Sequence, residues 1–203
     1  MIIKTFTAGF LENNMYLVLD ETSKKGVLID ATEALPELIE AAKDYDIEYI
    51  LLTHGHFDHI LGLNELKEKL GAKALLNQND LIISDNVNEF TRLFNQQNIV
   101  PPTYEKFVHD GDIINVGNLN LKVITTPGHT EGGVCYLIDE KLFSGDTLFR
   151  GTVGRTDLFG GNFEKLKDSV QNKLFRLDKN IKVFPGHGPT TTIGYEKKYN
   201  EII

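Results

Sequence analysis

The stretch Thr53-His54-Gly55-His56-Phe57-Asp58-His59 places three imidazoles and one carboxylate directly after the apolar run 49–52. Side chains alternate in direction along extended backbone, so His54 and His56 are expected to point to the same side. A turn through Gly55 and Phe57 would then direct Asp58 and His59 toward a second, nearby point. Such crowding is costly unless a cation compensates for the desolvation. The stretch therefore predicts a site for two neighbouring metal ions, and its density disfavours a chance histidine-rich loop.

The size and composition indicate an ordinary globular protein. A chain of 203 residues can bury a substantial core, and we expect a single domain over 1–203. Apolar residues make up 41% and charged residues 25%. The net charge of −8 argues against a nucleic-acid partner, because phosphate binding needs a basic face. No apolar run reaches the roughly 18 residues of a membrane span, so no membrane partner is expected.

The single cysteine, Cys135, lies in the apolar run 134–138. It is interpreted as a small buried hydrophobic residue rather than a nucleophile. One cysteine excludes an intramolecular disulfide, and the first residues lack the features of a secretory signal. A cytoplasmic location is therefore the default expectation. The oligomeric state is left open.

Apolar runs between turn residues predict many short strands, together with several helices. The predicted strands are 2–7, 14–19, 26–30, 48–52, 73–76, 106–109, 113–116, 119–125, 133–138, 141–144 and 181–184. The predicted helices are 33–45, 61–70, an irregular stretch 79–98, 163–177 after the N-cap Asn162, and 193–202. Loops are expected through Pro101-Pro102, where a substrate-facing insertion is placed, and over the glycine-rich 145–161. Two similar halves of this kind predict an α+β fold, with two packed sheets and helices on the outside.

Three further candidate ligands share the context of His54. His129, Asp146 and His187 each follow an apolar strand and sit beside a glycine, which permits close approach at a sheet edge. His109 lacks this context and is interpreted as an ordinary exposed residue. The candidate ligands are therefore His54, His56, Asp58, His59, His129, Asp146 and His187.

This ligand set narrows the metal chemistry. Without thiolates, a closed cysteine-type zinc site is excluded. Imidazole and carboxylate ligands suit zinc, iron or manganese, and we expect two divalent ions, with zinc as the first choice. Asp146 is the natural bridge, because a carboxylate has two oxygens to offer. Water held by two cations about 3.5–4 Å apart is largely hydroxide at neutral pH, and it can attack a carbonyl or phosphoryl centre.

Four motifs, in order, resemble the metal-binding motifs of the metallo-β-lactamase superfamily. They are Thr53-His54-Gly55-His56-Phe57-Asp58-His59, Pro127-Gly128-His129-Thr130, Ser144-Gly145-Asp146-Thr147-Leu148-Phe149 and Pro185-Gly186-His187-Gly188-Pro189. The resemblance implies an αββα sandwich with the metals at one edge. It also implies one metal held by His54, His56 and His129, another held by Asp58, His59 and His187, and Asp146 as the bridge.

Within the superfamily, Gly154-Arg155-Thr156-Asp157 and Gly186-His187-Gly188-Pro189-Thr190-Thr191 resemble the glyoxalase II group in its short bacterial form. This group, the hydroxyacylglutathione hydrolases, splits S-D-lactoylglutathione or a similar thioester. The resemblance implies that a metal-bridging hydroxide attacks the thioester carbonyl, with Asp58 as a ligand that also orients it. Arg155 lies where the family binds the carboxylate of the thiol carrier, although a simple pair with Asp157 is the alternative. Longer members have a C-terminal helical domain that supplies much of the glutathione contact and has no counterpart in this sequence, so another low-molecular-weight thiol stays open as the carrier.

Several other functions remain open at this point. A persulfide dioxygenase with one iron, held by residues corresponding to His54, His129 and Asp146, is the nearest rival. The Gly186-His187-Gly188-Pro189 motif favours the hydrolase. A true β-lactamase is disfavoured because those enzymes generally lack an aspartate at the position of Asp146, and the acidic charge disfavours the nuclease branches. A non-catalytic metal-binding module is a further alternative, against which the intact ligand set argues.

Overall fold

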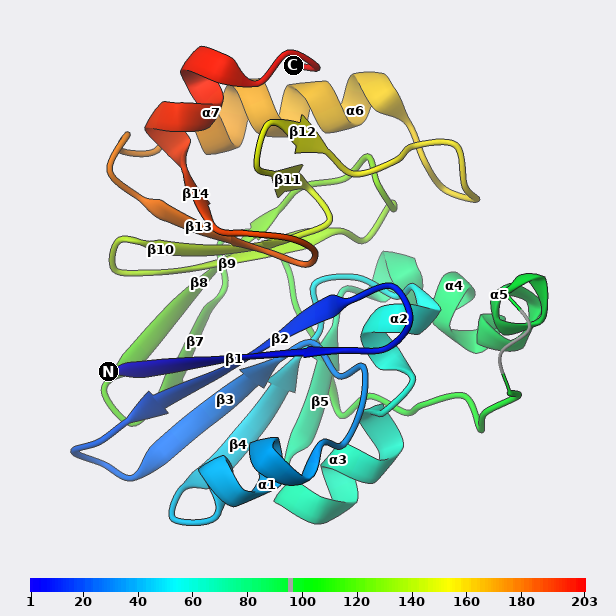
Figure 1. Cartoon of the computed structure of the whole chain (residues 1–203), viewed down its shortest axis with the longest axis vertical. Helices are drawn as coiled ribbons and strands as arrows, with labels where there is room; N and C mark the ends of the chain where they lie inside the picture. The colour runs from blue at the N-terminus through cyan, green and yellow to red at the C-terminus, as the bar shows by residue number, and fades with distance from the viewer. Residues whose placement is uncertain (95–96) are drawn as a thin grey trace.

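The computed structural model describes residues 1–94 and 97–203. Two mixed sheets of six strands each pack face to face, with helices on both outer faces (Figure 1). The strand orders are β1-β2-β3-β4-β5-β6 and β14-β13-β10-β9-β8-β7. This arrangement confirms the predicted αββα sandwich.

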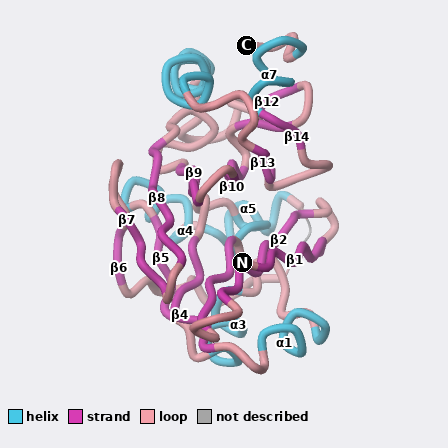
Figure 2. Tube along the Cα trace, turned by 90° about the vertical axis from the view of Figure 1, so that its left-hand side faces the viewer, coloured by secondary structure: helices cyan, strands magenta, loops and turns pink. Residues whose placement is uncertain are grey.

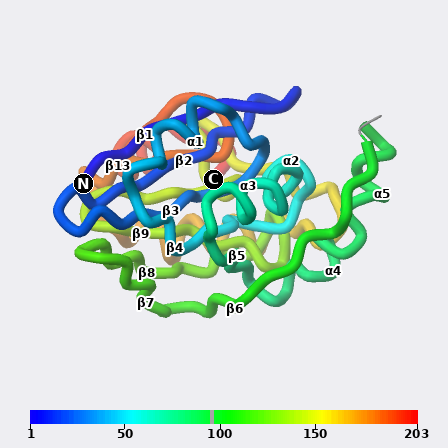
Figure 3. The backbone as a smooth tube through the Cα atoms, turned by 90° about the horizontal axis from the view of Figure 1, so that it is seen from below, coloured from blue at the N-terminus to red at the C-terminus, as the bar shows by residue number. Residues whose placement is uncertain are grey.

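The first sheet and its helices come from the first half of the chain. Its strands are β1 (Ile2–Ala8), β2 (Asn13–Asp20), β3 (Lys25–Ile29), β4 (Asp46–Leu51), β5 (Lys73–Leu76) and β6 (Lys106–Phe107). Its helices are α1 (Pro36–Ala42), α2 (Phe57–Ile60), α3 (Leu63–Leu70), α4 (Leu81–Asp85) and α5 (Val87–Leu93), with a 3₁₀ turn at Gln78–Asp80. Seen from below, α1 and α3 lie in front of the sheet, while α4 and α5 gather at one edge (Figure 3).

The second half of the chain builds the second sheet. Its strands are β7 (Ile113–Val116), β8 (Leu119–Thr125), β9 (Val134–Ile138), β10 (Lys141–Gly145), β13 (Lys182–Pro185) and β14 (Thr191–Thr192), with a small hairpin of β11 (Leu148–Phe149) and β12 (Thr152–Val153). Its outer face is covered by α6 (Phe163–Asp168) and α7 (Ile193–Tyr199) (Figure 2). A π-helical turn (Ser169–Lys173) and a 3₁₀ turn (Leu174–Arg176) continue α6.

Strand β2 shows why two layers of core form. All eight of its residues are buried, so it carries apolar side chains on both faces. Met15, Leu17 and Leu19 join the cluster beneath the helices of the first sheet. Tyr16 and Val18 face the other way, into the core between the sheets. A strand buried on both faces has no alternation of apolar and polar residues, which is typical of an inner strand of a layered fold.

Several element predictions need correction. The helix predicted over 33–45 covers only Pro36–Ala42, because Leu35 is extended before a proline at the first helical position. The helix predicted over 163–177 keeps α geometry only to Asp168, although Asn162 caps it as predicted by accepting from Lys165 N at 3.0 Å. The predicted glycine-rich loop contains the hairpin of β11 and β12.

The irregular helical stretch predicted over 79–98 is helical as far as Leu93, and residues 95–96 lie outside the described part of the chain. The stretch through Pro101-Pro102 is loop, as predicted. Within the described ranges, no helix has both the length and the apolar character needed to cross a bilayer.

Candidate metal centre

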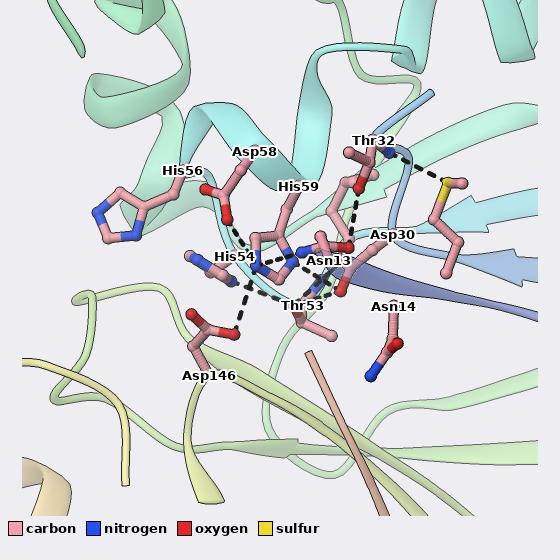
Figure 4. A network of polar contacts seen from close by, with 12 residues as sticks. Asn13, Asn14, Asp30, Thr32, Thr53, His54, His56, Asp58, His59 and Asp146 are labelled. Atoms are coloured by element: carbon pink, nitrogen blue, oxygen red, sulfur yellow. Dashed lines mark hydrogen bonds and ion pairs between the residues drawn. The ribbon is translucent and has the colours of Figure 1, made fainter. Parts of the chain in front are cut away.

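The predicted ligands lie where strands of both sheets end at one edge. His54 and His56 occupy the loop after β4, and Asp58 and His59 lie in the short helix α2 that begins at Phe57. Asp146 directly follows β10, while His129 and His187 lie in the loops after β8 and β13. Figure 4 shows Asp146 facing the residues of the histidine stretch. All seven predicted ligands therefore come together, and their role as ligands stays a prediction.

One group of donors consists of three buried imidazoles. His129 Nε2 lies 2.9 Å from His56 Nδ1 and 3.2 Å from His54 Nε2. The ring centroids of His54 and His56 are 4.8 Å apart, so the two rings are close neighbours, as alternation along the strand end predicts. The ligand atoms of His54, His56 and His129 all lie within 4.8 Å of one another, which makes them one candidate site.

A second group contains Asp58, His59 and His187, also with ligand atoms within 4.8 Å of one another. Asp58 Oδ2 lies 3.3 Å from His187 Nε2 and 3.5 Å from His59 Nε2. Asp146 reaches both groups. Its Oδ1 lies 3.4 Å from His59 Nε2, and its Oδ2 lies 3.5 Å from His187 Nε2 and 3.6 Å from His129 Nε2. This is the placement that a bridging carboxylate requires.

The donor set fits divalent cations. Among the described residues, His56 Nε2 and Asp146 Oδ1 are buried without a hydrogen-bond partner, which is unusual for polar atoms inside a protein. Burial strongly lowers the pKa of His54 and lowers the pKa of His56 to about 3, so both imidazoles are neutral at neutral pH. A neutral imidazole offers the lone pair that a metal needs.

In the second group, the neighbouring carboxylates favour the protonated form of the two histidines. Burial alone would lower the pKa of His59, but the charges of Asp30, Asp58 and Asp146 outweigh it and raise the pKa well above its usual value. Burial also opposes protonation of His187, but hydrogen bonds to Asp146 and Asp58 raise its pKa to about 10. Positive charge is therefore favoured at this point, whether protons or a metal cation supply it.

Contacts to the far ring nitrogens orient three of the imidazoles. His129 Nδ1 donates to the carbonyl oxygen of Arg155 at 2.7 Å, and His187 Nδ1 donates to that of Leu11 at 2.9 Å. His59 Nδ1 lies 2.8 Å from Asp30 Oδ2. Each contact leaves the Nε2 atom facing the cluster. Metal-binding histidines commonly have such a partner on the other ring nitrogen.

Asp30 is a supporting residue that the sequence analysis missed. Besides His59, it accepts hydrogen bonds from Thr53 N at 2.8 Å and from Thr53 Oγ1 (Figure 4). It therefore links the end of β3 to the histidine stretch through both Thr53 and His59. A signal existed, because Asp30 directly follows the apolar strand β3 just as Asp146 follows β10.

Asp80 is a second residue that was missed. Its carboxylate is fully buried and accepts from Gly55 N at 2.8 Å, Thr130 Oγ1 at 2.7 Å and Gly132 N at 2.6 Å. It thus holds the loop that carries His54 and His56 against the loop that carries His129. No sequence signal marked it, because it lies in the irregular helical stretch.

The other predicted residues lie outside the cluster. Arg155 forms a bidentate pair with Asp157, with nitrogen–oxygen distances of 2.7 and 2.8 Å, so the alternative weighed for it is observed. It also lines the cavity over the cluster, so a role in substrate binding stays a prediction. His109 is exposed beside Asp112, and Cys135 is fully buried, which raises the pKa of its thiol to about 11.

A cavity of about 330 Å³ lies over the candidate metal centre. Its polar lining consists of His56, Asp58, His129, Asp146, His187 and Arg155. The other lining residues in the described part of the chain are apolar. Cavities of this size, with convergent polar groups at one side, are typical of small-molecule sites.

Comparisons with known proteins identify a matching family and several similar proteins. Residues 8–187 match the model of the metallo-beta-lactamase superfamily. The hydroxyacylglutathione hydrolase GloC of Haemophilus influenzae is 32% identical over 211 residues, covering 100% of this chain and 98% of that protein.

Two solved structures have the same fold over nearly the whole chain. The B3 metallo-β-lactamase BLEG-1 is 30% identical, with a TM-score of 0.91 and 98% of each chain covered. TTHA1623, solved in a di-iron-bound form, is 33% identical, with a TM-score of 0.88 and coverage of 98% of this chain and 100% of that one.

Proposed function

Because this chain belongs to the metallo-β-lactamase superfamily, we propose that it is a metal-dependent hydrolase of thioesters such as S-D-lactoylglutathione. The observation that carries the proposal is the contact of Asp146 with both groups of donors, through His129 on one side and His59 and His187 on the other. A shared carboxylate between two sets of ligands is the arrangement of a two-metal hydrolytic site. The similarity to a hydroxyacylglutathione hydrolase supports the choice of thioester.

Two divalent cations at this centre would supply an activated water and electrophilic stabilisation of charge on the carbonyl oxygen. The donor set admits zinc, iron or manganese, and zinc is the first choice proposed here. His54, His56 and His129 would hold one ion, and Asp58, His59 and His187 the other.

The chain itself contributes orientation and charge. Burial would raise the pKa of Asp58, but His59 and His187 lower it, so the carboxylate is ionised at neutral pH. An ionised Asp58 can accept a hydrogen bond from the attacking water and hold its lone pair toward the carbonyl carbon. A thiolate leaves readily, because thiol pKa values lie near 8.5, so no strong general acid is required. Arg155, at the edge of the cavity, is proposed to bind a carboxylate of the thiol carrier.

The proposal is tested with protein that has been stripped of metal and reloaded separately with zinc, iron and manganese. We expect cleavage of S-D-lactoylglutathione, which is measured as the loss of thioester absorbance. Asp146→Ala should abolish turnover, because both donor groups lose their shared ligand, whereas His109→Ala should leave it unchanged. Turnover retained in Asp146→Ala would overturn the assignment of the bridge.

The nearest rival, a persulfide dioxygenase, needs only one iron and the donors His54, His129 and Asp146. These three side chains also lie close together, since His129 Nε2 lies 3.2 Å from His54 Nε2 and 3.6 Å from Asp146 Oδ2. However, that function leaves Asp58 and His187 unused, although they lie 3.3 Å apart in the same centre. Oxygen uptake with glutathione persulfide by the iron-loaded protein, without thioester cleavage, would favour the rival.

Two other rivals are tested in the same assays. Because of the similarity to BLEG-1, a β-lactam is included among the tested substrates. Asp146 disfavours a lactamase, because those enzymes generally lack an aspartate at this position. Faster cleavage of a β-lactam than of any thioester would favour that function. Metal-loaded protein without turnover on thioesters, persulfides and β-lactams would indicate a non-catalytic metal-binding module.

A further inference from the structure

The cavity over the candidate metal centre has walls of two kinds. The polar lining residues are predicted metal ligands, together with Arg155. The remaining lining residues in the described part of the chain are apolar, namely Leu11, Phe57, Phe90, Phe94, Phe149 and Leu158. These six residues are called the apolar wall below. They come from the β1–β2 hairpin tip, α2, the α5 region, β11 and the loop after β12, so five separate segments contribute to one cavity.

Aromatic packing holds part of this wall in place. Phe57 is 4% exposed, and its ring stacks against that of Phe94 with centroids 5.0 Å apart. Phe10, at the hairpin tip, lies 6.0 Å from Phe57 and 5.9 Å from Phe94 by ring centroids. The ring of Phe90 lies 6.0 Å from that of His56, so the wall begins directly beside a predicted ligand. A ligand can therefore meet the wall without first ordering it.

The polar side offers little for recognition once metals are bound. Among the described residues that line the cavity, every polar one except Arg155 is a predicted metal ligand. Arg155 is 54% exposed and already paired with Asp157, so it lies at the rim rather than in the depth of the cavity. A polar substituent buried against the apolar wall would lose its water without gaining a partner. An apolar substituent would gain free energy by leaving water.

Resting on the proposed thioester hydrolase function, we propose that the enzyme prefers thioesters with a bulky apolar acyl group, aryl or branched alkyl, over a small one such as lactoyl. The carrier's carboxylate is placed at Arg155 on the rim, which leaves the acyl group to enter the cavity. The acyl carbonyl then faces the metal centre, and its substituent lies against Phe57 and Phe90. Replacing a methyl by a phenyl group should improve binding about tenfold or more.

The binding test compares D-mandelate with D-lactate, which share the same hydroxy-acid head and differ in phenyl against methyl. Calorimetry with metal-loaded protein should give a dissociation constant about tenfold or more lower for D-mandelate. Phe90→Ser should bring the two constants close together. Leu93→Ser is the matched control, because Leu93 belongs to the same helix, is 76% exposed and does not line the cavity. Leu11→Ser, at an exposed position of the wall, serves as a second variant if Phe90→Ser does not fold.

The kinetic test uses the D-mandeloyl and D-lactoyl thioesters of glutathione and of N-acetylcysteamine, with kcat/KM compared within each carrier. A preference for mandeloyl that Phe90→Ser removes and Leu93→Ser retains would support the proposal. Equal binding of both acids within about twofold, or no saturable binding of D-mandelate at millimolar concentration, would overturn it. If the protein cleaves no thioester but still binds D-mandelate more tightly than D-lactate, the thioester hydrolase function is overturned. Binding of an apolar group against the apolar wall is then still supported.

Discussion

His59 Nδ1 and Asp30 Oδ2 are 2.8 Å apart, and both side chains are almost completely buried. This contact fixes the imidazole from behind while its Nε2 faces Asp58 and Asp146. Asp30 has a backbone φ of 61°, a left-handed conformation that asparagine also tolerates. A substitution of Asp30 by asparagine can therefore alter the hydrogen bond to the predicted ligand His59 without changing the backbone conformation.

Asp30→Asn should weaken metal binding about 10- to 100-fold, because the amide is a poorer partner for His59 than a carboxylate. The affinity is measured by competition with a chelator, and circular dichroism monitors the fold. Asp44→Asn, at an exposed position, is the control. An unchanged metal affinity in Asp30→Asn would show that the contact is structural only.

The candidate ligands outside the histidine stretch could be proposed from the sequence because they share one local pattern. Asp146 and His187 follow strands that end at the same edge, and the order of apolar run, glycine and polar residue is visible without a structure. Asp30 shares only part of this pattern, since it directly follows the apolar strand β3 but has no neighbouring glycine. Strand boundaries such as Ile113–Val116 and Leu119–Thr125 matched because tight turns delimit them.

The features that sequence analysis missed depend on contacts between distant segments. Asp80 acts through Gly55 and Gly132, which lie far from it in sequence and become neighbours only in the fold. The packing of Phe10 against Phe57 and Phe94 likewise joins three segments. No periodicity within one segment records such contacts, so the apolar wall could not be predicted.

Asp80→Asn should destabilise the protein, because an amide cannot accept hydrogen bonds at both of its positions as the carboxylate does. Asp80 Oδ2 accepts from Gly55 N and Thr130 Oγ1, and Oδ1 accepts from Gly132 N. At least one buried donor would be left without a partner, at a cost of about 1–3 kcal/mol. Urea unfolding measures the loss.

Asp85→Asn is the matched control for Asp80→Asn, because Asp85 ends the neighbouring helix α4 and is exposed. It should change the free energy of unfolding by no more than about 0.5 kcal/mol. Equal effects of the two substitutions would contradict the role assigned to Asp80.

Gly186→Ala should disrupt the bridge between the donor groups. A Cβ atom at Gly186 would lie 2.2 Å from Asp146 Oδ1 and 2.8 Å from His59 Cε1, so the carboxylate must move. We expect the variant to bind fewer than two metal ions per chain, measured by elemental analysis after gel filtration. Gly188→Ala is the control in the same loop.

Gly188 has a φ of +73°, and a Cβ atom there would have nothing within 4 Å. Gly188→Ala should therefore cost about 1–2 kcal/mol of stability through backbone strain but leave the metal content unchanged. Comparing the two alanines separates steric displacement of Asp146 from a general loss of stability. Full metal content in Gly186→Ala would show that the carboxylate relocates without losing its ligand role.

Metal-free protein should lose stability as the pH rises from about 7 to about 9. Burial opposes the charge on His187, but Asp146 and Asp58 raise its pKa from 6.5 to about 10, and Asp30 raises that of His59. The folded state then binds more protons than the unfolded state, so the contribution is complete below about pH 6.5 and is lost as the pH approaches the folded pKa. Each such proton contributes a slope of up to about 1.4 kcal/mol per pH unit.

Urea unfolding in the presence of a chelator measures this slope, and His187→Gln should reduce it because one of the titrating groups is removed. Metal loading should reduce it as well, since a cation replaces the protons on His59 and His187. The displaced protons give an independent measurement, because calorimetric titration of metal in buffers of different ionisation enthalpy should detect about one to two protons released per chain near pH 7.5. Metal uptake without proton release would contradict the charged state assigned to these two histidines, and with it the view that protons and metal ions compete for their ring nitrogens.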